Sequence, residues 1–169
     1  MSMKEIQGQP LDHGRKYEHV AVQQYESIKG FETNRCGLFV SQQHPYLAST
    51  PDRIVDENLL VEVKCPFVSR ERNISHQTVP YLLNTDNGLY LDNTHSYYYQ
   101  VQGQLSCSGR QACDFVVFTL KDMVIVRILR DEVFIQNMIG LLKRFYEDNF
   151  RPAIPHKYFY KQTHKYCFK

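Results

Sequence analysis

The feature that most constrains the fold is a stretch of 15 residues from Thr50 to Lys64, which reads TPDRIVDENLLVEVK. Two apolar runs in it are separated by the polar triplet Asp56-Glu57-Asn58. Apolar runs joined by a short polar segment are typical of a β-hairpin. The stretch therefore predicts two antiparallel strands, at 46–55 and 59–65.

The turn sets which side chains of this hairpin meet. A three-residue turn pairs Val55 with Leu59 and places Asp52 directly opposite Glu62. Opposed residues have Cβ atoms about 4.5–5.5 Å apart. Lys64 lies two residues beyond Glu62 and so shares its face. A shift of one residue would break this opposition, so the prediction depends on the turn.

Two facing carboxylates repel each other unless something neutralises them. Mg²⁺ prefers oxygen ligands and needs only one or two carboxylates besides water and substrate phosphate. A metal held there can activate water at a phosphodiester, while the lysine orients the water or neutralises developing charge. The alternative is a surface hairpin with a salt bridge, because this short pattern also arises by chance.

The rest of the chain predicts an α/β (α+β) protein with a mixed central sheet flanked by helices. Spacing of apolar residues predicts a first helix that Gly30 ends and a final helix that Asp131 caps and that Pro152 and Pro155 end. The final helix has a predicted core stripe of Phe134, Met138, Leu141 and Phe145. The predicted element order is α-β-β-β-α-β-β-α, with helices at 15–29, 94–108 (capped by Thr94) and 131–151, and strands at 36–41, 46–55, 59–65, 113–120 and 123–129.

Charge is unevenly distributed along the chain. Lys and Arg number 20 and Asp and Glu 18, a net charge of +2. Residues 149–169 hold five basic and no acidic residues, so the preceding part has 15 basic and 18 acidic residues, a net charge of −3. This basic tail is also rich in Phe and Tyr. It predicts either a segment that follows a nucleic-acid backbone and stacks on bases or a terminus that packs its aromatic rings on the core.

The sequence predicts an intracellular protein, in the cytoplasm or nucleus of a host cell, that is not secreted and has no membrane partner. Its N-terminus is polar and no apolar run is long enough to cross a bilayer. The five cysteines form no CxxC pair. Free thiols in a reducing compartment are the simplest interpretation.

Four segments, in a fixed order, carry a resemblance to a known family. The chain resembles the phage lambda exonuclease and YqaJ-like viral recombinase family of alkaline exonucleases, which are PD-(D/E)xK nucleases with a restriction-endonuclease-like core. The resemblance covers about residues 14–150. The matching segments are GRKYEHVA (14–21), TPDRI (50–54), LVEVKCPF (60–67) and YYYQVQ (97–102).

The resemblance implies specific roles. Asp52 and Glu62 would bind Mg²⁺, for which Mn²⁺ would substitute, together with the carbonyl of Val63. Lys64 would be the catalytic lysine. The other implied site residues are Glu18 (a second ion), Gln102 (the catalytic glutamine) and Thr50 (the terminal phosphate).

Three arginines near the hairpin are predicted to contact DNA. Arg53 replaces the glycine that usually follows the aspartate in this family, and it would either alter the turn or add a DNA contact. Arg70 and Arg72 follow the second strand. Arginine suits phosphate contacts. The alternative for Arg70 is a solvated loop in which Glu71 is its partner.

The predicted domains are a loose tail (1–13), a nuclease domain (14–150) and a basic-aromatic tail (151–169). The family's N-terminal segment that grips the 5′-phosphate has no counterpart in the sequence. This leaves open 5′-end selectivity and a ring-shaped trimer.

The sequence thus predicts a metal-dependent deoxyribonuclease that digests duplex DNA from an end, 5′ to 3′, for a single-strand annealing recombination partner. Two alternatives remain. One is an endonuclease on DNA or RNA with the same fold. The other is a catalytically silent nucleic-acid-binding module.

Overall fold

The computed structural model describes residues 8–86 and 88–158. The chain divides into two compact units, one that ends at Arg130 and one that begins at Asp131. In the first unit the elements are α1 (Gln9–Lys29), β1 (Phe39–Val40), β2 (Ala48–Ser49), β3 (Arg53–Ile54), β4 (Leu59–Lys64), β5 (Leu82–Thr85), β6 (Gly88–Leu91), α2 (Ser96–Ser108), β7 (Ala112–Phe118) and β8 (Met123–Leu129). In the second they are α3 (Glu132–Phe145), the π-helical turn η1 (Tyr146–Phe150) and α4 (Arg151–Tyr158).

Helix α1 begins earlier than the sequence predicted. It starts at Gln9, so the prediction of a loose tail is wrong for residues 9–13. Pro10 lies in the first turn, where its fixed φ favours a helix and its missing N–H costs nothing. Gly30 ends the helix as predicted, in the left-handed conformation with φ 73° and its N–H bonded to the Glu26 carbonyl.

The central sheet is mixed, as predicted, with strand order β3-β4-β7-β8. β4 pairs antiparallel with β3 and parallel with β7, which pairs antiparallel with β8. The predicted strand 46–55 is instead two short strands in different sheets, β2 and β3. Pro51 lies between them and has no N–H for a strand ladder.

Two further predictions of the element order are corrected. Residues 66–93, in which the sequence predicted no helix or strand, contain the hairpin β5–β6. Helix α2 is capped by His95 rather than by Thr94, because the His95 ring nitrogen accepts from the N–H of Tyr97 at 3.2 Å.

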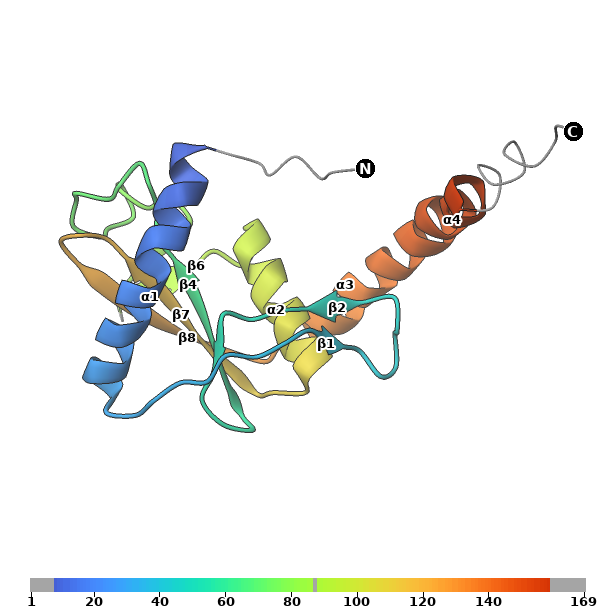
Figure 1. Cartoon of the computed structure of the whole chain (residues 1–169), viewed down its shortest axis with the longest axis horizontal. Helices are drawn as coiled ribbons and strands as arrows, with labels where there is room; N and C mark the ends of the chain where they lie inside the picture. The colour runs from blue at the N-terminus through green and yellow to red at the C-terminus, as the bar shows by residue number, and fades with distance from the viewer. Residues whose placement is uncertain (1–7, 87, 159–169) are drawn as a thin grey trace, which may run out of the picture. The chain divides into compact units, whose positions relative to one another are not determined.

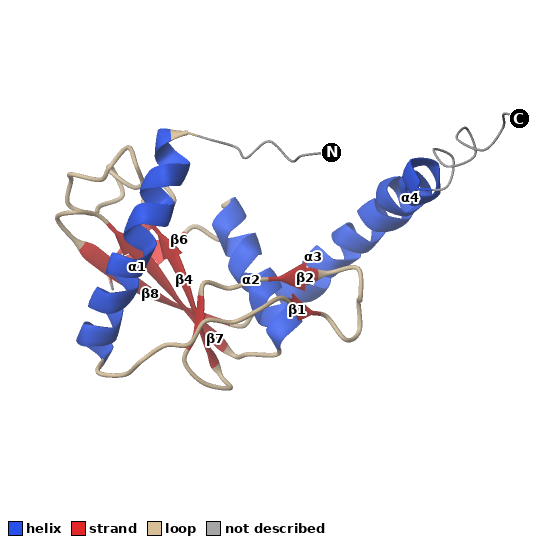
Figure 2. Cartoon of the chain, viewed as in Figure 1, coloured by secondary structure: helices blue, strands red, loops and turns tan. Residues whose placement is uncertain are grey.

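Helices cover both faces of the sheet at β4 (Figures 1 and 2). Val61 and Val63 pack against Ala21, Val22 and Tyr25 of α1 in one buried cluster. On the other face, Leu60 packs with Val101 and Leu105 of α2 and with residues of β5 and β6. Because side chains alternate along a strand, Glu62 and Lys64 face the α2 side, as Leu60 does.

In the second unit, Asp131 caps α3 as predicted, since its carboxylate accepts from the N–H of Phe134 at 2.9 Å. The predicted core stripe is partly wrong. The buried residues of α3 are Ile135, Met138 and Ile139, whereas the predicted Leu141 and Phe145 are 56% and 60% exposed.

The prolines do not end the last helix. Pro152 lies in the first turn of α4, where proline is tolerated, and helix continues to Tyr158. The predicted basic-aromatic tail therefore begins as a helix, and its residues 159–169 lie outside the described part of the chain. In that described part, no helix is both long and apolar enough to cross a membrane.

Candidate active site

The hairpin β3–β4 has the predicted register. Arg53 pairs with Val61 and Ile54 with Leu60, and the N–H of Val55 donates to Leu59. Asp56 holds the turn, because its Oδ1 accepts from the N–H groups of Asn58 and Leu59 at 2.7 and 2.9 Å. One step further along this register, Asp52 lies opposite Glu62.

Asp52 is held against the strand by a hydrogen bond from the N–H of Val63 to its Oδ2, at 2.7 Å. Burial and the negative charges of Glu62 and Glu18 raise the pKa of Asp52 from 3.8 to about 7. The Val63 hydrogen bond and the Lys64 ammonium act in the opposite direction without cancelling this effect. Loss of the Asp52 proton is therefore unfavourable in the metal-free protein.

Glu62 is 2% exposed and accepts three hydrogen bonds. Its Oε1 accepts from Lys64 Nζ at 2.7 Å and from Gln100 Nε2 at 2.6 Å. Its Oε2 accepts from Gln104 Nε2 at 2.7 Å. A buried carboxylate needs such donors, and here they come from its own strand and from α2.

The prediction that Gln102 reaches the site is wrong. Gln102 is fully buried and its Nε2 donates to the Leu129 carbonyl of β8 at 2.9 Å. Gln100 and Gln104 lie one helical turn apart and share a face, whereas Gln102 falls between them on another face. The i, i+4 spacing thus shows that Gln100 and Gln104 share a face, whereas the packing of α2 decides that this face meets Glu62.

We expect Gln100→Ala to lower nuclease activity about 10–100-fold, a loss typical for a residue that orients a metal-binding side chain. Glu62 keeps its hydrogen bonds from Lys64 and Gln104, so the melting temperature should change little. Gln102→Ala is the matched control. It should cost about 1–3 kcal/mol of stability, because Gln102 is fully buried and its hydrogen bond to the Leu129 carbonyl is lost, and it should leave the kcat of the folded protein unchanged. Steady-state kinetics and thermal melts test both variants. A loss of activity in Gln102→Ala and none in Gln100→Ala would show that Gln102 acts at the site instead.

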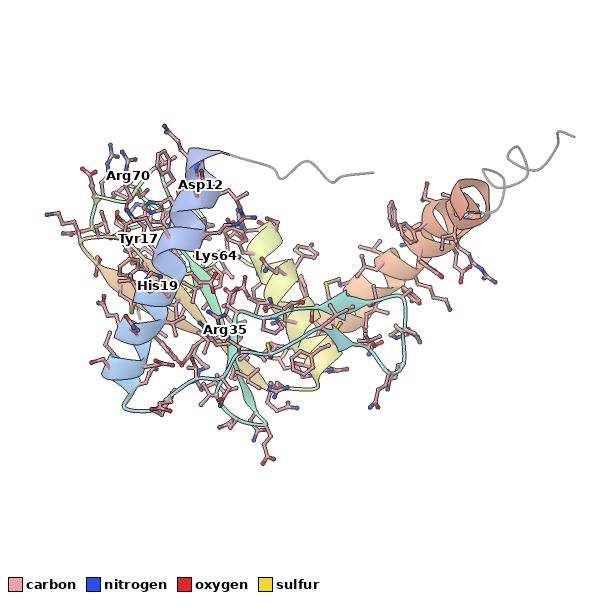
Figure 3. All side chains as sticks on the ribbon, viewed as in Figure 1. Asp12, Tyr17, His19, Arg35, Lys64 and Arg70 are labelled. Carbon is pink, nitrogen blue, oxygen red and sulfur yellow. The ribbon has the colours of Figure 1, made fainter. Side chains whose placement is uncertain are left out.

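Lys64 links the carboxylates to α2. Besides Glu62, its Nζ contacts Gln100 Oε1 at 3.1 Å and lies 4.5 Å from the centre of the Tyr97 ring. Its side chain is 18% exposed. Figure 3 shows it between α1 and α2. The ammonium is therefore fixed by three partners and still reachable from solvent.

Two cavities adjoin these residues, and Glu18 and Arg15 of α1 line both. The first, of about 350 Å³, is lined by Lys64 and by apolar and aromatic side chains. The second, of about 390 Å³, is lined by Arg15, Glu18, Arg35, Cys36, Thr50, Pro51, Asp52 and Arg53. We call the second the arginine cavity.

The arginine cavity gathers two residues that the sequence predicted for DNA binding, Thr50 and Arg53, with two that it missed, Arg15 and Arg35. Arg53 is 8% exposed and its buried Nε has no hydrogen-bond partner among the described residues. Guanidinium groups beside a carboxylate pair suit a phosphate. No spacing in the sequence could have identified Arg35, which follows α1 in an irregular segment.

Arg70 and Arg72 line neither of these two cavities. The guanidinium of Arg70 donates to the Phe67 carbonyl at 2.9 Å and lies 3.7 Å from Glu71. Figure 3 shows Arg70 and Lys64 at separate places in the fold. The contact of these two arginines with DNA stays a prediction.

The donor atoms suit a hard divalent cation. A carboxylate offers about four acceptor positions. Glu62 uses three of its positions and Asp52 uses one, so both retain free lone pairs. Among the described residues no three His, Cys, Asp or Glu side chains converge closely enough to hold an ion. Glu18 is therefore near the site without completing a three-carboxylate group. Mg²⁺ needs only one or two carboxylates.

Comparison with known structures extends the fold description. LHK-Exo in complex with dAMP superposes with a TM-score of 0.73 at 23% identity, over 92% of this chain and 76% of that chain. The alkaline exonuclease LHK-Exo from Laribacter hongkongensis gives 0.62 at 23% identity, over 88% and 76%. A phage-related exonuclease from Haemophilus somnus 129PT gives 0.60 at 14% identity, over 89% and 77%. The predicted PD-(D/E)xK type of fold is confirmed.

Sequence comparison gives the family. The chain is 29% identical over 122 residues to the uncharacterized protein R354 of Acanthamoeba polyphaga mimivirus. The match covers 66% of the chain and only 20% of R354, so the chain spans about a fifth of that relative's length. The family model of the YqaJ-like viral recombinase domain matches residues 2–111. The chain therefore belongs to the YqaJ-like viral recombinase domain family.

Proposed function

We propose that this chain is a metal-dependent deoxyribonuclease that digests duplex DNA from an end, in the 5′ to 3′ direction. The observation that carries the proposal is the arrangement of Asp52, Glu62 and Lys64 on one face of β3–β4, with Gln100 bridging Glu62 and Lys64. The family match and the names of the structural neighbours, which are exonucleases, support the same chemistry.

Asp52, Glu62 and the Val63 carbonyl would hold a Mg²⁺ ion, with Glu18 close to a second position. Such an ion, when bound, acidifies a water molecule and offsets phosphate charge. Lys64 and Gln100 would orient the attacking water and stabilise the negative charge that develops on the phosphate. Water adds to phosphorus and the bond to the 3′ oxygen breaks, which leaves a 3′-hydroxyl on the released nucleotide and a 5′-phosphate on the strand.

End-labelled linear duplex and a covalently closed circle, each with Mg²⁺ or EDTA, test the proposal. We expect Mg²⁺-dependent release of mononucleotides from the 5′ end of the linear duplex and an intact circle. Cleavage of the circle, or of RNA, would show an endonuclease instead. No metal-dependent cleavage of any of these would leave a nucleic-acid-binding module. A single-strand annealing recombination protein is the partner that such an exonuclease would supply with single strands.

The arginine cavity predicts how the strand is held. Arg35 is exposed and lines this cavity beside Asp52. Arg35→Ala should weaken duplex binding about tenfold and reduce the slope of log affinity against log salt by about 1, as expected for one lost phosphate contact. Fluorescence anisotropy with Ca²⁺ in place of Mg²⁺ measures both. Arg72→Ala, an equally exposed arginine outside both cavities, is the comparison. Weaker duplex binding in Arg72→Ala and unchanged binding in Arg35→Ala would show that DNA contacts the loop that follows β4 instead of the arginine cavity.

A further inference from the structure

The first cavity, beyond Lys64, has a composition unlike the arginine cavity. Its volume is about 350 Å³, close to the lower end of ligand pockets, which run from roughly 300 to 1,000 Å³. Pro10, Leu11 and Pro66 line it together with the rings of Tyr81 and Tyr97. We call it the aromatic cavity. A cavity of this volume can hold a flat ring system.

The aromatic walls are fixed in place. The rings of Tyr81 and Tyr97 meet edge to face with centroids 5.0 Å apart. Both also contact Phe115, at 6.1 and 5.9 Å, and Phe115 is fully buried in the central sheet. A wall braced in this way loses little side-chain entropy when it receives a ligand.

Gly14 of helix α1 lines this cavity without a side chain to fill it. The face of α1 that packs on the sheet through Ala21 and Tyr25 continues, one helical turn at a time, to Glu18 and Gly14. Glycine inside a helix is less favourable than alanine, yet a Cβ at Gly14 would meet nothing within 4 Å. Packing within the described chain therefore does not require a glycine. Its absent side chain leaves space in the aromatic cavity.

We propose that the aromatic cavity receives a nucleobase of the strand being cleaved, next to the scissile phosphate. This inference rests on the proposed nuclease function. Lys64 lines the cavity and also contacts Glu62, so a phosphate at the carboxylates and a base in the cavity would belong to adjoining parts of one strand. Bases stack on aromatic side chains with little regard to sequence. The cavity would therefore position the nucleotide without selecting a base.

Filling the cavity tests the proposal. Gly14→Leu places a side chain in the open space and should leave the melting temperature equal to or above that of the wild type, since leucine favours a helix more than glycine. Gly140→Leu is the matched control, because it makes the same change at a helical glycine of α3 that also has open space around it and lines neither cavity. We expect kcat/KM on linear duplex to fall about tenfold in Gly14→Leu and to stay within about twofold in Gly140→Leu, as loss of one stacked base predicts.

A second experiment removes the nucleobase from the substrate instead of filling the cavity. A duplex with an abasic nucleotide beside the scissile bond should be cleaved about tenfold more slowly by the wild type. Gly14→Leu should cleave the abasic and the normal duplex at equal rates, because the same contact has already been lost. The base site would be excluded if the rate losses from Gly14→Leu and from the abasic nucleotide multiply. It would also be excluded if the wild type cleaves the abasic and the normal duplex at the same rate. Either result would leave the proposal of duplex cleavage intact. If the wild type cleaves nothing, the nuclease proposal fails. Anisotropy with the normal and abasic duplexes in Ca²⁺ then decides the base site independently.

Discussion

Lys64→Ala should lower metal-dependent digestion of linear duplex about 10²–10⁴-fold, the range expected when a group that handles protons or charge in the transition state is removed. The ammonium contacts Glu62 at 2.7 Å and Gln100 at 3.1 Å, beside the carboxylates. Its loss also leaves the Oε1 of Glu62 with one donor fewer. Single-turnover rates of DNA cleavage at saturating enzyme give the effect on the chemical step.

Lys121→Ala serves as the control, because Lys121 is an exposed lysine in the turn between β7 and β8. Its activity should equal that of the wild type. Lys64→Arg separates charge from shape. It keeps the positive charge with a larger, planar head group, so we expect only partial recovery. Digestion at the wild-type rate by Lys64→Ala would exclude the proposed mechanism.

Asp52→Asn should abolish activity and at the same time stabilise the metal-free protein at pH 8. The pKa of Asp52 is raised from 3.8 to about 7 by burial, by Glu62 and by Glu18. A carboxyl whose pKa is raised in the folded state destabilises that state above this pKa. After allowance for solvent screening, the effect is about 2 kcal/mol. Thermal melts in EDTA should show a higher melting temperature for the variant, and Mg²⁺ should then stabilise the wild type only.

The sign of the pH dependence follows from the same shift. Between pH 4 and about 7 the folded protein binds a proton at Asp52 that the unfolded chain has lost, so stability without metal falls as pH rises through this range. Divalent ions bind the deprotonated carboxylate. Mg²⁺ affinity, and activity at limiting Mg²⁺, should therefore rise with pH toward and above 7. An activity profile that is flat from pH 5 to 9 at limiting Mg²⁺ would contradict this assignment of Asp52.

Asp114 is a control carboxylate, and its replacement by asparagine should lower the stability of the protein, whereas Asp52→Asn should raise it. Burial acts to raise its pKa, but hydrogen bonds from Arg127 and Tyr25 and the charge of Lys29 together hold the pKa below its usual value. Tyr25 donates to it at 2.7 Å, which ties α1 to β7. Asp114→Asn should therefore lower the free energy of unfolding by about 1.5–3 kcal/mol, the range for hydrogen bonds to a charged group, because the Arg127 side chain is 49% exposed and its charge is not left buried. Melts at pH 8 without metal compare the two variants directly.

The hairpin could be predicted because its geometry is local. A turn of known length fixes the register, and the alternation of side chains then fixes which residues share a face. Asp56 makes this turn specific through two hydrogen bonds. For the same reason the relation between Asp52, Glu62 and Lys64 required no knowledge of the rest of the fold.

The rest of the site depends on packing that the sequence does not state. The glutamines of α2 are spaced so that only some reach Glu62, and which ones do so depends on how the helix lies against β4. Arg35 comes to the arginine cavity only because the segment after α1 returns to pair Asn34 with Ile54. Such contacts join elements that are distant in the chain, and no short pattern encodes them.

The hydrogen bond from Val63 to Asp52 has a practical consequence. In a strand an N–H normally donates to a neighbouring strand, but this one donates to a side-chain carboxylate that is expected to bind metal. A proton or a cation that binds this carboxylate changes the electron density at the oxygen. The chemical shift of the Val63 amide proton should change with it. The backbone amide resonance of Val63 therefore reports the occupancy of the site, without an attached probe and without a substrate.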